Sequence, residues 1–521
     1  MERQTLTTPA KTMLASPLAP SGAVQWLTLF ERVSDSNLSL QGRIRQMLVS
    51  AILSGHLPPG SPAPSSRQLS DSLGVARNTV VFAYQQLVSE GYLVSRERSG
   101  HFIADDVLRS HVRSMPPDTS SPPAHSSAHW QQRMVFHPSR QRNIVKPENW
   151  QSMPFPFVYA QFDSSQFPTA EWRECCTRAL SVLDIRSWAP DLVTNDDADL
   201  IEEIRGQVLP RRGVWAEADE IVITVGAQHA LYLLADLLVH THTVVGMEDP
   251  GYPDARNTFA HRTERLMPLA IDEEGLCITP ALKACDYIFV TPSHQCPTSV
   301  TLPMERRIAL LDLVSRSDGI IIEDDYETEN RYDGHPSPAL KSLDRHGRVI
   351  YIGSLSKSFA PGLRIGYIVA PRELASELRA LRRLMLRHPS AYVQRAFALF
   401  ISLGHHHALL RRLSVLYAER AKTLTTALQA ELPEFELVPI SGGSSCWIKA
   451  PQGVNTQQLA DAALKEGVVI EPGHVFYHRP GANNKNYIRM GFASIDKNKI
   501  PEGIQKLAKV YHQLSQADTA G

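Results

Sequence analysis

The first strong hydrophobic pattern of the chain lies between residues 39 and 55. Its apolar residues recur at the spacing of one helical face and are Leu40, Ile44, Met47, Leu48, Ile52 and Leu53. Gly55 is a stop signal for this helix, because glycine readily adopts the left-handed conformation that ends helices. A second short helix is predicted to begin after a cap at Ser65 or Ser66 and to end at Gly74.

A third helix and a hairpin complete this block. The segment VARNTVVFAYQQLVSEG predicts a helix that ends at Gly91. The residues that follow, YLVSRERSGHFIA, alternate between apolar and polar types around a turn at residues 98–100. Three helices followed by a β-hairpin predict an N-terminal winged helix-turn-helix domain over residues 37–104.

From about residue 151 the pattern changes to short apolar runs that alternate with helical segments. The runs are EIVITVG, HTVVGMED, YIFVTPS, GIIIEDDY, RVIYIGSLS and RIGYIVAP. Strands buried on both faces have such uninterrupted apolar runs, and their alternation with helices predicts an α/β fold with a mostly parallel sheet. The stretch from SGGSSCWIKAP to NYIRMGFAS predicts a small C-terminal α+β lobe.

The length of the chain agrees with a multidomain protein. Its 521 residues exceed the size that one hydrophobic core usually serves, about 250–300 residues. Residues 105–150 contain MPPDTSSPPAHSSAHW, whose proline and serine content is typical of a linker. The predicted parts are a tail at 1–36, the winged helix at 37–104, a linker at 105–150 and the larger α/β domain at 151–515.

Composition and charge narrow the class of protein. With a net charge of −1, any nucleic-acid contact must come from a local basic patch. The six cysteines lack C-x-x-C spacing, which predicts reduced thiols and a cytoplasmic protein. The chain has no run of about 18 apolar residues, so no membrane span is expected. His405–His407 are consecutive and cannot share one helical face, so no metal site is expected either.

The N-terminal block has the residues of a DNA-reading module. In a helix-turn-helix the first residues of the recognition helix reach base edges, and these are Arg77, Asn78 and Thr79 here. Arg67, at the start of the preceding helix, is placed to contact a phosphate. Six arginines stand against three acidic residues between 39 and 104, which is a modest basic footprint. The alternative is a protein-interaction module with ordinary surface arginines.

The same block resembles the GntR-type winged helix. The segment SGHLPPGSPAPSSRQLSDSLGVARNTVVFAYQQLVSEGYL follows that family throughout. The resemblance implies that Arg67, Arg77, Asn78 and Thr79 contact DNA. The wing departs from the family's Gly-Ser-Gly-Thr-Phe and reads RSGHFI, so that His101 replaces a small residue.

One lysine in the second region is placed for covalent chemistry. Lys357 follows the strand YIGSLS, in a turn rich in hydroxyl groups, and a Schiff-base lysine needs such a fixed position together with a low pKa. Ser354, Ser356 and Arg364 suit a phosphate group. Arg364 could equally form a surface ion pair.

Further segments supply groups that suit a ring and a phosphate near this lysine. Asp324 and Tyr326 end a buried strand, where the carboxylate would pair with a pyridine nitrogen and the tyrosine would bond the ring oxygen. The backbone N–H groups at Ala227 and Gln228 begin a helix and would point at a phosphate. Tyr252 offers an aromatic face for stacking. Taken singly, Asp324 could be a helix cap and Tyr252 a turn residue.

The order of these residues resembles the fold-type I pyridoxal phosphate enzymes, the aminotransferase family, over residues 151–515. The resemblance implies that Lys357 forms the internal aldimine, Asp324 pairs with the ring nitrogen, Tyr326 bonds the ring oxygen and Tyr252 stacks on the ring. It implies a phosphate site built from Ala227, Gln228, Ser354, Ser356 and Arg364. It further implies that Arg489, in YIRMGFAS, binds a substrate carboxylate.

Nearly the whole chain after about residue 25 resembles the MocR/GabR group of transcription regulators. The resemblance implies a head-to-tail homodimer that binds promoter DNA and senses an amino compound, which displaces the lysine as an external aldimine and repositions the DNA-binding domains. One alternative is an active aminotransferase with an accessory N-terminal DNA-binding or dimerisation module. Another is a DNA-binding protein with an inactive cofactor fold, against which the retained Lys357 argues.

Two departures from the family bear on the ligand. GABA-sensing members have a His-Arg pair after the stacking tyrosine, whereas this chain has Asp254, which argues against GABA. If Asp254 faces the pocket, it favours a second cationic group, as in a diamino acid such as 2,4-diaminobutyrate or an ectoine breakdown product. The alternative is that Asp254 caps a helix or points to solvent.

The second departure is Cys296, at the place where many aminotransferases have an asparagine that bonds the ring oxygen. A thiol is a weak donor, and His294 or Gln295 are candidates to replace it.

Overall fold

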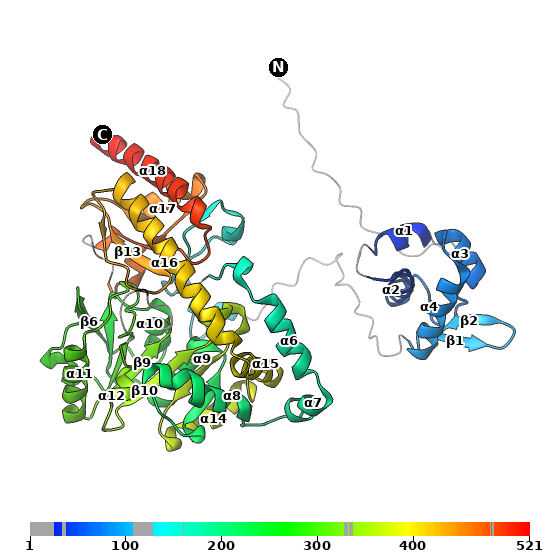
Figure 1. The fold of residues 1–521 in the computed structure, drawn as a ribbon, viewed down its shortest axis with the longest axis horizontal. Coiled ribbons are helices and arrows are strands. Elements are labelled where there is room, and N and C mark those ends of the chain that lie inside the picture. The colour runs from blue at the N-terminus through cyan, green and yellow to red at the C-terminus, as the bar shows by residue number, and fades with distance from the viewer. Residues whose placement is uncertain are drawn as a thin grey trace. The chain divides into compact units, whose positions relative to one another are not determined.

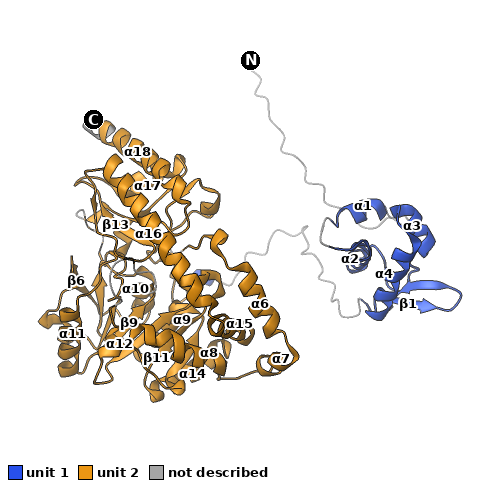
Figure 2. Ribbon diagram, viewed as in Figure 1, with its two compact units in different colours: residues 1–131 blue, residues 132–521 orange. Residues whose placement is uncertain are grey.

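The computed structural model describes residues 26–33, 38–107, 129–159, 161–327, 332, 337–479, 481 and 484–520. It divides into two compact units, residues 1–131 and residues 132–521 (Figure 2). The first 25 residues of the predicted tail and residues 108–128 of the predicted linker lie outside the described residues.

The first unit is the predicted winged helix with one additional helix. Its elements are α1 (Trp26–Glu31), α2 (Leu40–Leu53), α3 (Ser66–Leu73), α4 (Arg77–Ser89), β1 (Leu93–Arg96) and β2 (Gly100–Ile103) (Figure 1). The predicted ends of α3 are confirmed: the Ser65 hydroxyl accepts a hydrogen bond from the backbone N–H of Gln68, and Gly74 has a φ of 63°. The hairpin strands pair antiparallel, with Leu93 opposite Ile103.

Helix α1 lies in the segment that the sequence pattern assigns to a tail. Its Phe30 side chain is buried, and the guanidinium of Arg43 from α2 lies 4.3 Å from the centre of the Phe30 ring. Nε of Arg43 also donates to the carbonyl oxygen of Val33. The helix is short, so its apolar residues make no long periodic run, and contacts with α2 and α3 stabilise it.

The second unit begins at Gln132, earlier than residue 151, where the sequence pattern places the α/β domain. Nη2 of Arg142 donates to the carbonyl oxygens of Tyr477 and His478, at 2.6 and 3.0 Å. These bonds tie the end of the predicted linker to the C-terminal lobe, so this part of the segment belongs to the fold of the second unit.

An eight-stranded sheet lies at the centre of the second unit. The strand order is β4-β11-β10-β9-β8-β5-β6-β7. The strands are β4 (Ile221–Thr224), β5 (Val245–Asp249), β6 (Leu266–Asp272), β7 (Gly275–Leu276), β8 (Tyr287–Val290), β9 (Ile320–Asp325), β10 (Val349–Ser354) and β11 (Gly366–Val369). Strand β11 is antiparallel to both of its neighbours and β7 is antiparallel to β6, whereas the other pairs are parallel. The prediction of a mostly parallel sheet is confirmed.

Helices cover both faces of this sheet (Figure 1), which explains the uninterrupted apolar runs. The covering helices include α8 (Ala198–Glu203), α9 (Gly226–Leu238), α10 (Pro253–Ala260), α11 (Met304–Ser317), α14 (Arg372–Leu386), α15 (Ala391–Ser402) and α16 (His405–Glu431). Ile350 and Ile352 of β10 pack with α9, α10 and α14. Tyr351, on the opposite face of the same strand, packs in the cluster that contains α8, α15 and α16.

The C-terminal lobe has its own antiparallel sheet, in the order β12-β13-β16-β15. This α+β lobe was predicted from the sequence. Its elements are β12 (Glu436–Leu437), β13 (Ser445–Lys449), α17 (Thr456–Lys465), β15 (Glu471–Pro472), β16 (Tyr487–Gly491) and α18 (Ile500–Ala520). Other elements of the second unit are β3 (Phe155–Pro156), α6 (Thr169–Ala179), α7 (Val182–Trp188), α12 (Leu340–Leu343), α13 (Ser356–Phe359) and β14 (Val468–Val469).

Strands β4, β5, β8, β9 and β10 all run in the same direction, so their carboxyl ends lie along one edge of the sheet. Ligands of α/β proteins bind at such an edge. Within the described residues, no helix is long and apolar enough to cross a membrane, and no cluster of three or more His, Cys, Asp or Glu side chains could hold a metal ion.

Candidate functional site

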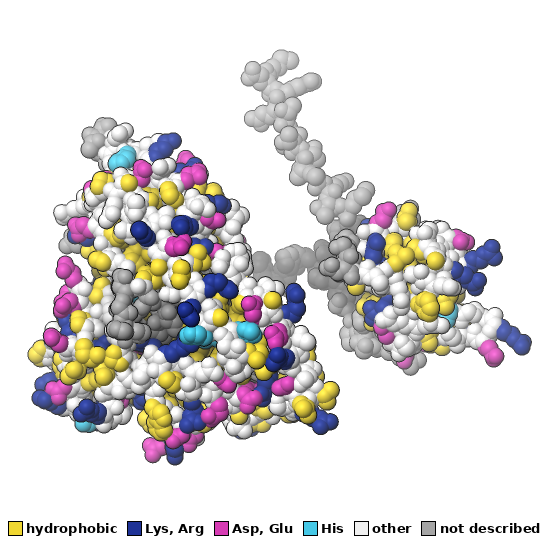
Figure 3. Space-filling model, viewed as in Figure 1, with side chains coloured by type: hydrophobic (Ala, Val, Ile, Leu, Met, Phe, Trp, Pro, Cys, Tyr) yellow, Lys and Arg dark blue, Asp and Glu magenta, His cyan; other side chains and the backbone are white. Residues whose placement is uncertain are grey.

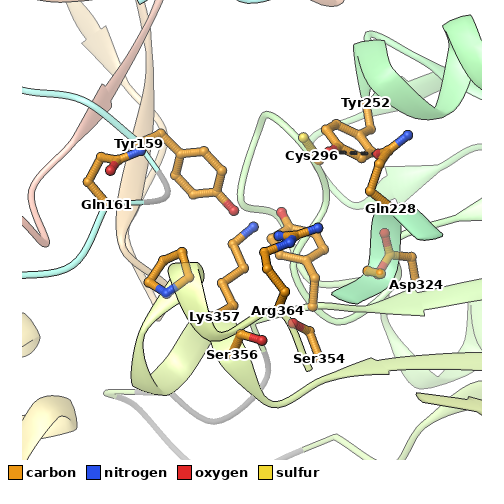
Figure 4. A pocket seen from close by; sticks show the side chains of 13 residues that line it. Tyr159, Gln161, Gln228, Tyr252, Cys296, Asp324, Ser354, Ser356, Lys357 and Arg364 are labelled. Carbon is orange, nitrogen blue, oxygen red and sulfur yellow. Dashed lines mark hydrogen bonds between the residues drawn. The ribbon is translucent and has the colours of Figure 1, made fainter. Parts of the chain in front are cut away.

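A cavity of about 300 Å³ lies at the carboxyl ends of these strands (Figure 4). It brings together residues from segments far apart in the sequence. Its lining consists of Tyr159, Gln161, Ala227, Gln228, Tyr252, Cys296, Asp324, Tyr326, Ser354, Ser356, Lys357, Pro361 and Arg364. All nine cofactor-binding residues predicted from the sequence are in this set.

Lys357 extends into the middle of the cavity from α13. Its Nζ lies 4.1 Å from the ring centre of Tyr326 and 4.4 Å from that of Tyr159. Loss of hydration lowers the pKa of Lys357 below its usual value, and the negative charge of Glu327 partly opposes this effect. A lowered pKa makes the neutral, nucleophilic amine more accessible, as a Schiff-base lysine requires.

Asp324 lies at the end of β9 and is 3% exposed. Its Oδ1 is buried and accepts no hydrogen bond from the described residues. Burial raises the pKa of Asp324 to about 7, and the positive charge of Lys357 opposes that rise. A buried carboxylate oxygen without a donor fits the protonated nitrogen of a pyridine ring, which would supply both the donor and the opposite charge.

The two predicted aromatic residues face the same cavity from different loops. The hydroxyl of Tyr252, which immediately precedes α10, donates to Oε1 of Gln228 at 3.3 Å and to Oδ2 of Asp254 at 3.2 Å. These bonds fix the ring at the cavity wall. Tyr326 follows β9, with its ring beside Nζ of Lys357.

The phosphate end of the predicted site lies at the start of α9. Ala227 and Gln228 are in the first turn of this helix, where backbone N–H groups lack helical partners. Gly226 has a φ of 74°, and a Cβ there would lie 2.9 Å from Nη2 of Arg364. Glycine therefore lets the Arg364 guanidinium approach the helix start, where it also donates to the carbonyl oxygen of Val225.

The two serines of the predicted phosphate site differ. Ser354 lines the cavity at the end of β10. The hydroxyl of Ser356 donates to the carbonyl oxygen of Ile365 at 2.8 Å and accepts from the N–H of the same residue. Its hydroxyl proton is thus engaged by the backbone, so Ser356 holds the turn around Lys357 in place.

Arg489 of β16 lies behind Tyr159 rather than on the cavity lining. Its guanidinium carbon lies 3.9 Å from the ring centre of Tyr159 and 4.5 Å from that of Phe476. Nε donates to Oε2 of Glu471 at 2.8 Å, and Nη2 is buried with no hydrogen-bond partner among the described residues. One side of the guanidinium is thus compensated, and the other is available to an acidic group.

Asp254 is not among the residues that line the cavity. It lies in the first turn of α10, where its Oδ2 accepts from the hydroxyl of Tyr252 and its Oδ1 accepts from the side-chain amide of Asn143. Each carboxylate oxygen therefore has one hydrogen-bond partner within the protein. The expectation that Asp254 faces a ligand is corrected: it joins the 138–150 segment to the stacking tyrosine.

His294 and Gln295 were the candidates to replace the asparagine that many aminotransferases have at the position of Cys296. Nε2 of Gln295 donates to the carbonyl oxygens of Pro250 and Cys296, and its Oε1 accepts from the backbone N–H and hydroxyl of Thr298. Gln295 is thus fully engaged away from the cavity. The ring of His294 lies 6.0 Å from that of Tyr326, and Nε2 lies 3.5 Å from Oε2 of Glu327. Tyr326, whose ring lines the cavity, stays the predicted donor for the ring oxygen.

In the first unit the predicted DNA-contacting residues lie at the starts of α3 and α4. Arg67, Arg77 and Asn78 are exposed and Thr79 is half-buried. Nε of Arg77 lies 3.3 Å from the hydroxyl of Ser66, so the two helix starts are adjacent. Figure 3 shows cationic side chains over the same part of this unit and at the tip of its hairpin.

His101 lies in β2 opposite Ser95, in the second residue pair from the turn of the hairpin. Its ring packs edge-on against Tyr84 of α4 at 5.1 Å, and Nδ1 lies 3.0 Å from the hydroxyl of Ser95. The departure from the family's small residue therefore attaches the hairpin to α4. Arg98 occupies the turn, with a φ of 61°.

Comparisons with known proteins place both units in families. Residues 195–507 match Aminotransferase class I and II, and residues 40–103 match Bacterial regulatory proteins, gntR family. HTH-type transcriptional regulator TauR of Rhodobacter capsulatus is 40% identical over 476 residues, which are 90% of this chain and 96% of that protein. The probable rhizopine catabolism regulatory protein MocR of Rhizobium meliloti is 32% identical over 92% of this chain and 95% of that protein. The chain belongs to the MocR-type transcription regulators.

Solved structures agree with the aminotransferase fold of the second unit. An archaeal alanine:glyoxylate aminotransferase is 30% identical, with a TM-score of 0.64 over 68% of this chain and 90% of that chain. The Pyrococcus horikoshii kynurenine aminotransferase, solved with PMP, is 25% identical, with a TM-score of 0.66 over 74% and 98% of the two chains. The cofactor of this MocR-type regulator is pyridoxal phosphate, and the unpartnered Oδ1 of Asp324 and the start of α9 fit it.

Sequence patterns did not indicate several residues at the site, namely Tyr159, Gln161, Glu327 and Glu471. Tyr159 and Gln161 precede the sheet in the chain and meet Lys357 only through the fold. Glu327 stands directly after the Asp-x-Tyr pair, which was the one local signal that could have drawn attention to it.

Proposed function

We propose that this MocR-type regulator controls transcription in response to a primary amine that carries an acidic group. The observation that carries the proposal is one cavity lined by Lys357 and Asp324, with Arg489 stacked directly behind the Tyr159 ring of its wall. The same chain has an exposed recognition segment on its first unit. Pyridoxal phosphate supplies a carbonyl that condenses reversibly with primary amines.

Each residue of the chain has a separate task in this proposal. Lys357 holds the cofactor and gives up its place to the incoming amine. Asp324 keeps the ring nitrogen protonated, and Tyr326 donates to the ring oxygen. The start of α9 with Arg364 binds the phosphate, and Nη2 of Arg489 binds the acidic group of the amine.

The acidic group is the part of the ligand that the geometry supports best. Arg489 is 2% exposed and stacks on Tyr159, so its guanidinium has little bound water to lose when an acid binds. The acid gains a charge-assisted hydrogen bond from it. A diamino acid or an ectoine-derived ligand was suggested by Asp254, and that residue is bonded to Tyr252 and Asn143 instead.

Regulation further requires that ligand binding changes the affinity of the winged helices for DNA. We propose a homodimer whose winged helices bind promoter DNA through Arg67, Arg77, Asn78 and Thr79. A ligand can shift such a system only by binding its two states with different affinity. The segment at 138–150 supports this link, because Asn143 bonds Asp254 and Lys146 bonds the carbonyl oxygen of Tyr159 at 2.6 Å.

An absorbance titration combined with a DNA-binding assay tests the proposal. Full-length protein with its cofactor is titrated with a panel of amino acids and amino sulfonates, while fluorescence anisotropy follows DNA from upstream of its coding region. We expect one class of acidic amine to change the cofactor spectrum and the DNA affinity at the same concentration. A spectral change with no change in DNA affinity, together with an oxo product, would favour the aminotransferase alternative, which the similarity to aminotransferase structures keeps open.

A further inference from the structure

Nζ of Lys357 lies between two aromatic rings, at 4.1 Å from the centre of Tyr326 and 4.4 Å from the centre of Tyr159. Figure 4 shows the lysine pointing toward Tyr159. Ring faces attract an ammonium ion, so the two tyrosines favour the charged form of this amine. The burial of the amine acts in the opposite direction.

Glu327 is a buried carboxylate beside these rings. It follows Tyr326 directly, and its side chain is 4% exposed. The hydroxyl of Ser444 donates to Oε1. Oε2 accepts no hydrogen bond from the described residues, although Nε2 of His294 lies 3.5 Å away. A buried carboxylate with one uncompensated oxygen is costly unless a cation faces it.

Several charged or titratable groups act on the Lys357 amine besides the two rings. The groups that act on its amine are Glu327, Cys296, Asp324, Arg489 and Lys146. Burial raises the pKa of the Cys296 thiol to about 11, so it is neutral near pH 7. Arg489 and Lys146 are cations, and Asp324 is the partner of the cofactor's ring nitrogen. Among these groups, Glu327 has the largest effect on the Lys357 amine and favours its charged form.

We propose that Glu327 and the two tyrosine rings hold Lys357 as an ammonium ion after a ligand amine has replaced it on the cofactor. This inference rests on the proposed function. In the exchange, the carbon–nitrogen bond to Nζ breaks as the bond to the ligand nitrogen forms. The ligand enters as an ammonium ion and two of its protons end on Nζ, so the lysine leaves as –NH3⁺ and total charge is conserved.

This arrangement separates binding from turnover. In an aminotransferase a neutral lysine takes a proton from the carbon next to the ligand nitrogen, which is general base catalysis. An ammonium ion paired with Glu327 has no lone pair for that proton. The liganded state therefore persists long enough to bias DNA binding. Glu327 acts here as a positioning residue, because it works through Lys357.

The pKa of the released lysine is measurable in the full-length protein with its cofactor. Aminooxyacetate serves as the probe, because its aminooxy group binds the cofactor carbonyl and frees Lys357 whatever the natural ligand is. Acylation of Lys357 by acetic anhydride is followed across pH by mass spectrometry of its peptide. The midpoint of the acylation rate against pH gives the pKa of the released lysine. We expect Glu327→Gln to lower this midpoint by about one pH unit, which makes acylation about tenfold faster at pH 7.

Matched variants complete the design. Asp254→Asn removes a carboxylate whose two oxygens are bonded elsewhere, so it should keep the wild-type midpoint. Glu327→Asp keeps the charge and should restore most of the midpoint, and Glu327→Met is a second uncharged variant should Glu327→Gln not fold. Equal midpoints in wild type and the uncharged variants would overturn the proposal, and so would absence of acylation in all of them. If the proposed function is wrong, a different result is expected: no amine changes the DNA affinity of the wild-type protein.

Discussion

The two units of this regulator present their functional side chains in opposite ways. In the first unit, Arg67, Arg77 and Asn78 are exposed at adjacent helix starts. In the second unit, Asp324 and Arg489 are buried and come from different sheets. Exposed charges act on a partner through a field that salt screens, whereas buried charges act in a low dielectric that strengthens each interaction and shifts pKa values.

Because of this difference, substitutions in one unit should impair the function of that unit alone. A change at the cofactor site alters what is sensed and leaves the DNA-contacting surface as it is. A change on α3 or α4 alters affinity for DNA and leaves the cofactor spectrum as it is.

Replacement of Lys357 by alanine should remove the covalent response entirely. No other described residue places an amine in the cavity, since its lining contains no second lysine. We expect no absorbance change with any amine. Affinity for DNA in the absence of ligand should stay within about twofold of wild type, because substitutions at sites that share no partners usually act independently. A loss of DNA affinity as large as the loss of amine response would contradict the separation.

Replacement of Arg77 by alanine should act on the opposite unit. One base or phosphate contact of an arginine contributes about 1–3 kcal/mol, so DNA affinity should fall by roughly tenfold to a hundredfold. If Arg77 contacts a phosphate, the slope of log affinity against log salt should also fall by about one. Amine titrations monitored by absorbance should match wild type. Gln86→Ala on the same helix, away from its start, is the matched control and should keep DNA affinity.

The same difference explains how much the sequence could predict. The first unit depends on local signals, and Ser65 and Gly74 mark the ends of α3 as predicted. Lys357 and Asp324 were also predicted, because each stands at the end of an apolar strand in a distinctive motif. Those strand ends lie along one sheet edge, so their convergence followed from the parallel arrangement.

The parts that were not predicted depend on contacts between distant segments. The segment at 138–150 has a linker-like composition, but Arg142 and Lys146 bind carbonyl oxygens of the folded domain. Asp254 was expected to face a ligand, and the amide of Asn143, more than a hundred positions earlier, occupies one of its oxygens. Composition and periodicity carry no information about such pairs.

Replacement of Arg489 by lysine should change selectivity within the second unit. Lysine keeps the charge but loses the planar fork, and a hydrogen bond to a charged group contributes about 1.5–3 kcal/mol. Affinity for amino acids should fall by roughly tenfold to a hundredfold, whereas affinity for simple alkylamines should change less than threefold. The measurement is an absorbance titration with each class. Equal losses for both classes would mean that Arg489 supports the cavity rather than binding an acid.

The smallest effect concerns the pH dependence of stability in the second unit without cofactor. Burial raises the pKa of Asp324 to about 7 in the folded state, above the value of about 3.9 for an unfolded aspartate. Between these two pKa values the folded state therefore binds more protons than the unfolded state. Because of this, Asp324 makes the free energy of unfolding fall as pH rises from about 4, until the carboxyl is ionised in both states above about pH 7. Between pH 6 and pH 8 the loss from this residue should be about 1 kcal/mol.

Asp324→Asn isolates that contribution, because asparagine has a similar shape and no charge to bury. Urea unfolding of cofactor-free wild type and variant at pH 6 and pH 8 gives the free energies of unfolding. The variant should gain about 1 kcal/mol relative to wild type on going from pH 6 to pH 8, and the gain should vanish when pyridoxal phosphate is bound, because the protonated ring nitrogen then compensates the Asp324 charge. The unfolding transition of the first unit should be the same in both proteins at both pH values. A pH-independent difference between the two would mean that Asp324 is ionised in the folded state throughout, with a counter-ion other than the cofactor.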